Sequence, residues 1–222
     1  MEGVRHTNLR IHPYRIKGLS TTPESASQDQ QKYSVALIII DSVSHGVFAR
    51  DFKETKRVFE QDFRDTAFIF NHTTVLGYNS GPNVNGILLE PNIFEVARES
   101  NITTSAFEDY CGISNWMSKI FPYKEHLIRA LCNYHGHLLA LYYSNPRPGC
   151  EHGEPFINHY LRYIQDYWNV YKGLRKLHVS KPNGRIDEND WPLANFLKEF
   201  VPRSPETAVI IASDHGFHWD PV

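Results

Sequence analysis

Two stretches of this chain combine a short apolar run with side chains that bind metal ions. Residues 34–40 are almost unbroken in hydrophobicity and rich in β-branched side chains, and Asp41 follows them directly. Residues 207–212 form a second such run, which leads to Asp214 and His215. A short apolar run that ends in a carboxylate is typical of a buried parallel strand with function at its carboxyl end. Two interior strands of one sheet are therefore expected to bring three ligand-type side chains into one cleft.

A serine in a turn-rich loop is a candidate nucleophile for that cleft. Ser80 lies within residues 77–83, whose sequence Gly-Tyr-Asn-Ser-Gly-Pro-Asn is rich in turn formers. Metal-assisted ester hydrolysis needs a nucleophile beside the ions, and the flanking Gly81 and Pro82 favour an exposed hydroxyl. Taken alone, Ser80 reads as an ordinary turn serine, so its role depends on its meeting Asp41 in the fold.

Alternating strands and helices are expected to position these residues. Hydrophobic spacing predicts helices at residues 47–63, 83–89, 92–99, 156–171 and 191–200, with Asn83 as a cap and Pro192 in a first turn. Further strands are predicted at residues 66–70 and 102–107. Residues 116–143 are expected to be helical in parts, whereas residues 145–155 and 174–190 read as loop or turn-rich sequence. This alternation predicts an α/β fold with a largely parallel sheet.

Length and charge limit the classes of partner. The chain has 222 residues, enough for one sizeable core, and residues 1–32 read as a flexible polar leader. Its 23 basic and 25 acidic residues are interspersed and give a net charge of −2, so neither nucleic acid nor an anionic membrane is an expected partner. No apolar segment is long enough to span a membrane, and the N-terminus lacks the apolar core of a signal peptide.

Cysteines and asparagines leave the cellular compartment open. Cys111, Cys132 and Cys150 are compatible with one disulfide and one free thiol, or with three thiols. Asn71 and Asn101 each begin a glycosylation sequon, a pattern that suits a secretory protein but also arises by chance.

Four segments taken together resemble one family. Residues 35–55, 77–89, 105–109 and 207–217 resemble the sulfatase-like domain of unknown function 229, within the alkaline phosphatase and sulfatase superfamily. That family has a strand ending in Asp-Ser-x-Ser-Arg, then Phe-x-Arg and Thr, a Gly-x-Asn-Thr-x-Pro-Asn segment, a Glu-Asp pair and an Asp-His-Gly. The matching residues here are Asp41, Ser42, Ser44, Phe48, Arg50, Thr55, Gly77, Asn79, Ser80, Pro82, Asn83, Glu108, Asp109, Asp214, His215 and Gly216.

The resemblance implies a fold and an activity. The expected fold is a three-layer α/β/α sandwich of the alkaline phosphatase type over residues 33–222, incomplete at its C-terminus. The expected activity is hydrolysis of a small-molecule or glycan phosphate or sulfate ester, with one or two divalent cations, zinc or alternatively calcium, in an extracellular or secretory setting. Ser80 holds the position of the nucleophile. The implied metal ligands are Asp41, Asp214, His215, His178 and Asp190, and the implied substrate-binding residues are Asn79, His45 and Arg50.

Departures from the family pattern support a second hypothesis. Val84 stands where sulfatases carry the arginine of the formylglycine signature, which favours a plain hydroxyl nucleophile. His45 and His218 replace two arginines, Val179 replaces an aspartate, and the late histidine of the superfamily has no counterpart before Val222. The alternative is therefore an inactive or truncated family member that acts as a binding or structural module.

Overall fold

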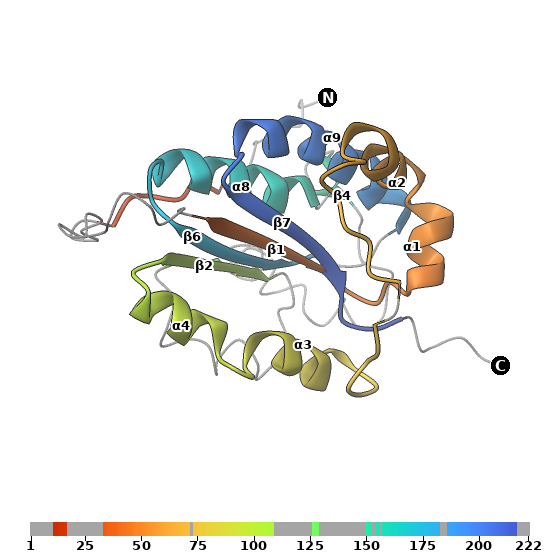
Figure 1. Cartoon of the computed structure of the whole chain (residues 1–222), viewed down its shortest axis with the longest axis horizontal. Helices are drawn as coiled ribbons and strands as arrows, with labels where there is room; N and C mark the ends of the chain where they lie inside the picture. The colour runs from red at the N-terminus through yellow and green to blue at the C-terminus, as the bar shows by residue number, and fades with distance from the viewer. Residues whose placement is uncertain are drawn as a thin grey trace, which may run out of the picture.

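A parallel sheet forms the centre of the molecule (Figure 1). The computed structural model describes residues 11–16, 33–71, 73–108, 126–128, 150–151, 154–155, 157–182 and 186–216. Within these residues the sheet has the strand order β3-β2-β6-β1-β7, and every neighbouring pair is parallel. The strands are β1 (Ser34–Ile40), β2 (Thr103–Glu108), β3 (His126–Ile128), β6 (Lys176–Lys181) and β7 (Thr207–Ser213). A separate antiparallel pair consists of β4 (Cys150–Glu151) and β5 (Glu154–Pro155).

Helices cover both faces of the sheet, which confirms the predicted α/β/α sandwich (Figure 1). One face carries α1 (His45–Asp51), α2 (Lys53–Arg57), the π-helical turn η1 (Val58–Asp62), α8 (Ile157–Val170) and α9 (Ile186–Arg203). The other face carries α3 (Ser80–Leu88) and α4 (Ile93–Glu99).

The side chains of β1 alternate between these two layers. Ala36, Ile38 and Ile40 belong to the core under α8 and α9, whereas Leu37 and Ile39 belong to the core under α3 and α4. Successive side chains of a strand point to opposite faces, so β1 is buried on both sides and reads as a continuous apolar run.

The predicted proximity of the two strands that lead to Asp41 and Asp214 is confirmed. β1 and β7 are adjacent and parallel, and Ile40 lies opposite Ser213 in the register. Asp41 and Asp214 therefore follow at matching positions at one edge of the sheet. The expectation that both strands are interior is wrong for β7, which is the last strand of the described sheet and leaves Ile210 46% exposed.

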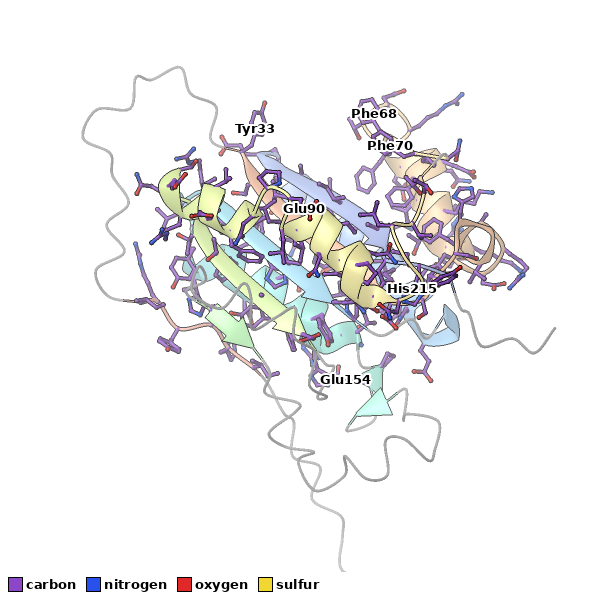
Figure 2. All side chains as sticks on the ribbon, turned by 90° about the horizontal axis from the view of Figure 1, so that it is seen from below. Tyr33, Phe68, Phe70, Glu90, Glu154 and His215 are labelled. Carbon is purple, nitrogen blue, oxygen red and sulfur yellow. The ribbon has the colours of Figure 1, made fainter. Side chains whose placement is uncertain are left out.

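The strand predicted at residues 66–70 is absent. This segment follows η1 in an irregular conformation, and Phe68 and Phe70 are 83% and 78% exposed. Both rings lie at the periphery of the molecule (Figure 2). A short apolar run is an ambiguous signal, because hydrophobicity does not itself supply a neighbouring strand.

Residues 174–190 contain a central strand, so the prediction of turn-rich sequence there is wrong. β6 lies between β2 and β1, and all six of its residues are buried. The sequence does not show this strand as a hydrophobic run, because four polar residues interrupt it: Lys176, His178, Ser180 and Lys181. The last helix also begins earlier than predicted, at Ile186, so Pro192 lies inside it.

Helix boundaries on the way to the site differ in detail. The helix predicted at residues 47–63 is helical but divides at Phe52, whose ring is fully buried and stacks on Phe48. α3 begins at Ser80 with Asn79 as its cap, so Asn83 is not the cap that the sequence suggested. The helix predicted at residues 92–99 is confirmed as α4, and Asn92 is its cap.

Several predictions fall wholly or partly outside the described residues. These concern Cys111, Cys132, most of residues 116–143 and 145–155, and most of the leader at residues 1–32. Within the leader, residues 11–16 are described: His12 pairs with Asp166 of α8 at 3.0 Å, and the Ile16 amide donates to the hydroxyl of Tyr171, the residue after α8, at 3.1 Å. None of the helices in the described part of the chain has the length and hydrophobicity that a membrane crossing requires.

Candidate active site

The loop after β1 and the end of β7 form one hydrogen-bonded unit. The Ser42 amide donates to Asp214 Oδ1 at 3.1 Å, and the Val43 amide donates to Ser213 Oγ at 3.1 Å. Ser42 has a φ of 60°, a left-handed conformation that is uncommon for a residue with a side chain. Its hydroxyl donates to Asp41 Oδ2 at 3.1 Å. The turn therefore fixes Asp41 and Asp214 relative to each other.

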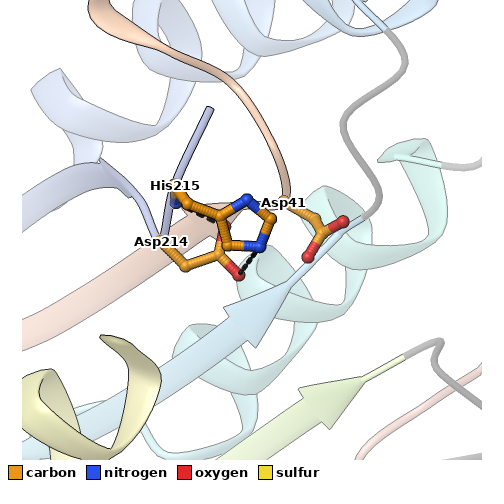
Figure 3. A group of neighbouring side chains, drawn as sticks. All are labelled: Asp41, Asp214 and His215. Carbon is orange, nitrogen blue, oxygen red and sulfur yellow. Dashed lines mark hydrogen bonds and ion pairs between the residues drawn. The ribbon is translucent and has the colours of Figure 1, made fainter. Parts of the chain in front are cut away.

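His215 is oriented by the backbone that follows it. Its Nδ1 lies 2.7 Å from the carbonyl oxygen of Gly216, an acceptor, so Nδ1 carries the proton. Nε2 is then the acceptor nitrogen, and it points toward Asp214 Oδ2 at 3.7 Å (Figure 3). An imidazole whose Nδ1 is held by a carbonyl is the form in which histidine binds a metal or accepts a proton.

Ser80 reaches this group from the other layer. It is the first residue of α3, and its Oγ donates to Asp41 Oδ1 at 3.1 Å and lies 3.2 Å from His215 Nε2. Asn83 fixes the preceding loop: its Oδ1 accepts from the amides of Leu76 and Gly77, and its Nδ2 donates to the carbonyls of Gly77 and Asn79. The predicted convergence of Ser80, Asp41 and His215 is therefore present.

Lys181, at the end of β6, is a member of the site that the sequence reading missed. Its side chain is only 7% exposed, and its Nζ forms ion pairs with Asp41 Oδ1 and, at 3.2 Å, with Asp214 Oδ2. The signal that reveals it is alternation: Leu177 and Val179 face the same core as Leu37, and Lys181 is next in that series.

Mutual charge stabilisation dominates the electrostatics. Burial opposes ionisation of Asp41, but the adjacent Lys181 outweighs it and, with the Ser80 hydrogen bond, lowers the pKa of Asp41 to about 2. Burial likewise opposes the charge of Lys181, and the carboxylates of Asp41 and Asp214 raise its pKa in spite of it. Asp41 and Lys181 are therefore both charged at neutral pH.

The structure does not bring His178 and Asp190 to this group. His178 lies in mid-strand opposite Ala36, five residues before Asp41, and Ala36 packs under α8 and α9, away from α3. Its Nδ1 is 2.6 Å from Ser105 Oγ, and burial lowers its pKa to about 3. Asp190, on α9, accepts from the amides of Glu54 and Thr55 at 2.9 and 2.8 Å, so it caps α2. Neither residue therefore lies beside Asp41, Asp214 and His215; the sequence analysis had predicted no strand at β6, where His178 lies.

The three expected substrate-binding residues are all exposed. Asn79 is exposed, and its side chain accepts from the Gly81 amide at 3.2 Å. His45 is exposed at the start of α1, after Ser44, which caps that helix. Arg50 is exposed and paired with Asp51 at 2.8 Å. None of these contacts tests a role in binding substrate.

The donor set fits one divalent cation. Asp41, Asp214 and His215 each offer a ligand atom, and these atoms lie within 4.8 Å of one another; no second such group occurs among the described residues. Asp214 Oδ2 is buried, and its partner is the Lys181 ammonium group at 3.2 Å, so this position already attracts positive charge. Two carboxylates and an imidazole suit zinc.

Comparison with known proteins identifies the family but no close relative. No curated protein and no solved structure matches the chain. One family model matches residues 2–115, which is more than half of the chain and includes Asp41 and Ser80. The chain therefore belongs to the family described as "Protein of unknown function (DUF229)".

Proposed function

We propose that this domain is a metal-dependent hydrolase of phosphate or sulfate esters, as its resemblance to the alkaline phosphatase and sulfatase superfamily implies. The observation that carries the proposal is the position of Ser80. Its hydroxyl lies within 3.1 Å of Asp41 and 3.2 Å of His215, although 39 and 135 residues separate it from them in the chain. A hydroxyl between a carboxylate and an imidazole is the arrangement of an activated nucleophile.

Asp41, Asp214 and His215 are the residues that would hold the cation. A bound divalent cation would lower the pKa of the Ser80 hydroxyl and offset negative charge on the ester oxygens. His215 presents Nε2 because Gly216 holds Nδ1, and Asp214 is oriented by the Ser42 amide. The backbone around the site thus presets the ligands.

Ser80 attacks the phosphorus or sulfur atom in this proposal. The bond from Oγ to that atom forms as the bond to the leaving alcohol breaks, and the alcohol oxygen takes up a proton. Asp41 and His215 would both be engaged as ligands, so the Ser80 proton passes to solvent, and the leaving alcohol takes up its proton from solvent as well. Water then cleaves the Ser80 ester and restores the hydroxyl.

Activity toward an aryl phosphate and an aryl sulfate, measured with and without added zinc, tests the proposal. The matched variants are Ser80→Ala and Ser100→Ala; Ser100 follows α4 at the opposite edge of the sheet. We expect Ser80→Ala to lower turnover at least about a thousandfold with unchanged zinc content, and Ser100→Ala to behave as wild type. Turnover that survives Ser80→Ala would refute the role of Ser80.

Lys181 is the observation that favours the second candidate, a domain that keeps the fold without hydrolysis. Its ammonium group already neutralises Asp41 and Asp214, so the site is electrostatically satisfied by the chain itself. Absence of turnover on both esters, together with absence of bound zinc in correctly folded protein, would establish this candidate.

A further inference from the structure

A buried lysine lies where two metal-ligand carboxylates converge. Lys181 Nζ contacts Asp41 and lies 3.2 Å from Asp214 Oδ2, and the Asp214 side chain is fully buried. The register of β6 and β1 pairs Ser180 with Ile38, so Lys181 follows that pair by one residue and Asp41 follows it by three. The four methylene groups of Lys181 span that offset and place the charged group beyond the end of its own strand.

The three side chains face the same helical layer. Leu37 and Ile39 precede Asp41 on the face under α3 and α4, and Val179 precedes Lys181 on that same face. Ala212 packs against the same core and lies two residues before Asp214, so both side chains are on this face of the sheet. The ammonium group and the two carboxylates therefore share the space that Ser80 enters from α3.

We propose that Lys181 is an internal counter-ion that occupies the cation position of this site, so that a divalent cation binds only when the lysine side chain leaves. The inference rests on the metal ligands of the proposed function. An ammonium group that is ion-paired with both carboxylates occupies the oxygens that a metal needs at a shorter distance. A metal and the ammonium group would also repel each other strongly at that separation in a buried site.

The fold offers the displaced lysine another acidic partner. Glu108 is the register partner of Lys181 on the neighbouring strand β2, and it is fully buried. Ala106, two residues earlier, belongs to the core under α3 and α4, so Glu108 faces the same layer as Lys181. The Lys181 side chain can therefore turn toward β2 while keeping a carboxylate neighbour.

Calorimetric titration with zinc, and separately with calcium, tests the inference on the full chain. Lys181→Met removes the ammonium group, and Lys181→Arg is the matched control that keeps a positive charge. We expect Lys181→Met to bind zinc at least about tenfold more tightly than wild type, and Lys181→Arg to bind no more tightly than wild type. Equal affinity of wild type and Lys181→Met would overturn the inference and leave the metal site intact. Absence of binding in both would overturn the proposed metal site together with the inference.

A second measurement uses the wild-type protein, in case the methionine variant does not fold. Acetylation of lysines, followed by peptide mass spectrometry, reports the accessibility of Lys181, with the exposed Lys172 as internal reference. We expect slow labelling of Lys181 in metal-free protein and faster labelling at saturating zinc. Labelling of Lys181 that zinc leaves unchanged, while zinc is bound, would overturn the inference.

Discussion

Acid sensitivity of the fold should depend on one histidine inside the sheet. His178 is fully buried, and desolvation lowers its pKa from 6.5 to about 3. Its neighbours among the described residues are uncharged: Ser105 Oγ lies 2.6 Å from Nδ1, and the ring centroids of Tyr163 and Tyr167 lie 5.8 and 6.2 Å from that of His178. The folded state therefore holds His178 neutral where the unfolded chain would bind a proton.

The sign follows from that difference in pKa. Above pH 6.5, the pKa of His178 in the unfolded chain, the histidine is neutral in both states, so its ionisation does not change the free energy of unfolding. As the pH falls toward the folded value of about 3, protons bind the unfolded state preferentially, and stability is lost. Between about pH 7 and about pH 5 this single group should lower the free energy of unfolding by about 2 kcal/mol.

Urea denaturation of wild type and His178→Asn across that pH range measures the effect. Asparagine retains a polar atom near the position of Nδ1 for Ser105 but does not titrate. We expect the variant to be less stable at neutral pH, because the smaller side chain leaves a cavity, yet to lose about 2 kcal/mol less on acidification than wild type. His45→Asn controls for removal of an exposed histidine. Parallel pH profiles for wild type and His178→Asn would refute the reasoning.

Two further substitutions separate structural from chemical roles. Asp190→Ala removes the acceptor for two amides at the start of α2, so we expect a loss of about 1–2 kcal/mol in urea denaturation with unchanged zinc affinity; loss of zinc binding would instead restore its role as a ligand. Asn83→Asp exchanges two donated hydrogen bonds for repulsion between a carboxylate and the Gly77 and Asn79 carbonyls. We expect turnover and stability to fall, the latter by about 1–3 kcal/mol, while zinc content is retained; wild-type turnover would show that this loop does not position Ser80.

Much of the fold could be predicted because its strongest signals are local. The run at β1 is apolar on both faces, and an aspartate marks its end, so the strand and the edge of the sheet at which Asp41 lies follow from the sequence alone. β7 has the same pattern, an apolar run followed by an aspartate, and this pattern predicts that Asp214 lies beside Asp41. The helix predicted at residues 92–99 is present as α4, with Asn92 as its cap.

What the sequence could not supply is the polar central strand and its consequences. β6 is buried although four residues of its sequence Lys-Leu-His-Val-Ser-Lys are polar, because Ser105 contacts His178 and two carboxylates pair with Lys181. Those partners come from β1, β2 and β7, far away in the chain, and no local pattern encodes them. Because the sequence analysis did not predict β6, it named His178 as a metal ligand and did not include Lys181 in the site.

The account depends most on Ser80 being the atom that accepts the transferred group. Mass spectrometry of protein that has been incubated with an aryl phosphate and zinc, then quenched in acid, examines this directly. The account predicts one phosphoryl group on the peptide that contains Ser80, and none on that peptide in the Ser80→Ala variant. Phosphorylation of a different residue, or undiminished release of phosphate by Ser80→Ala, would contradict it.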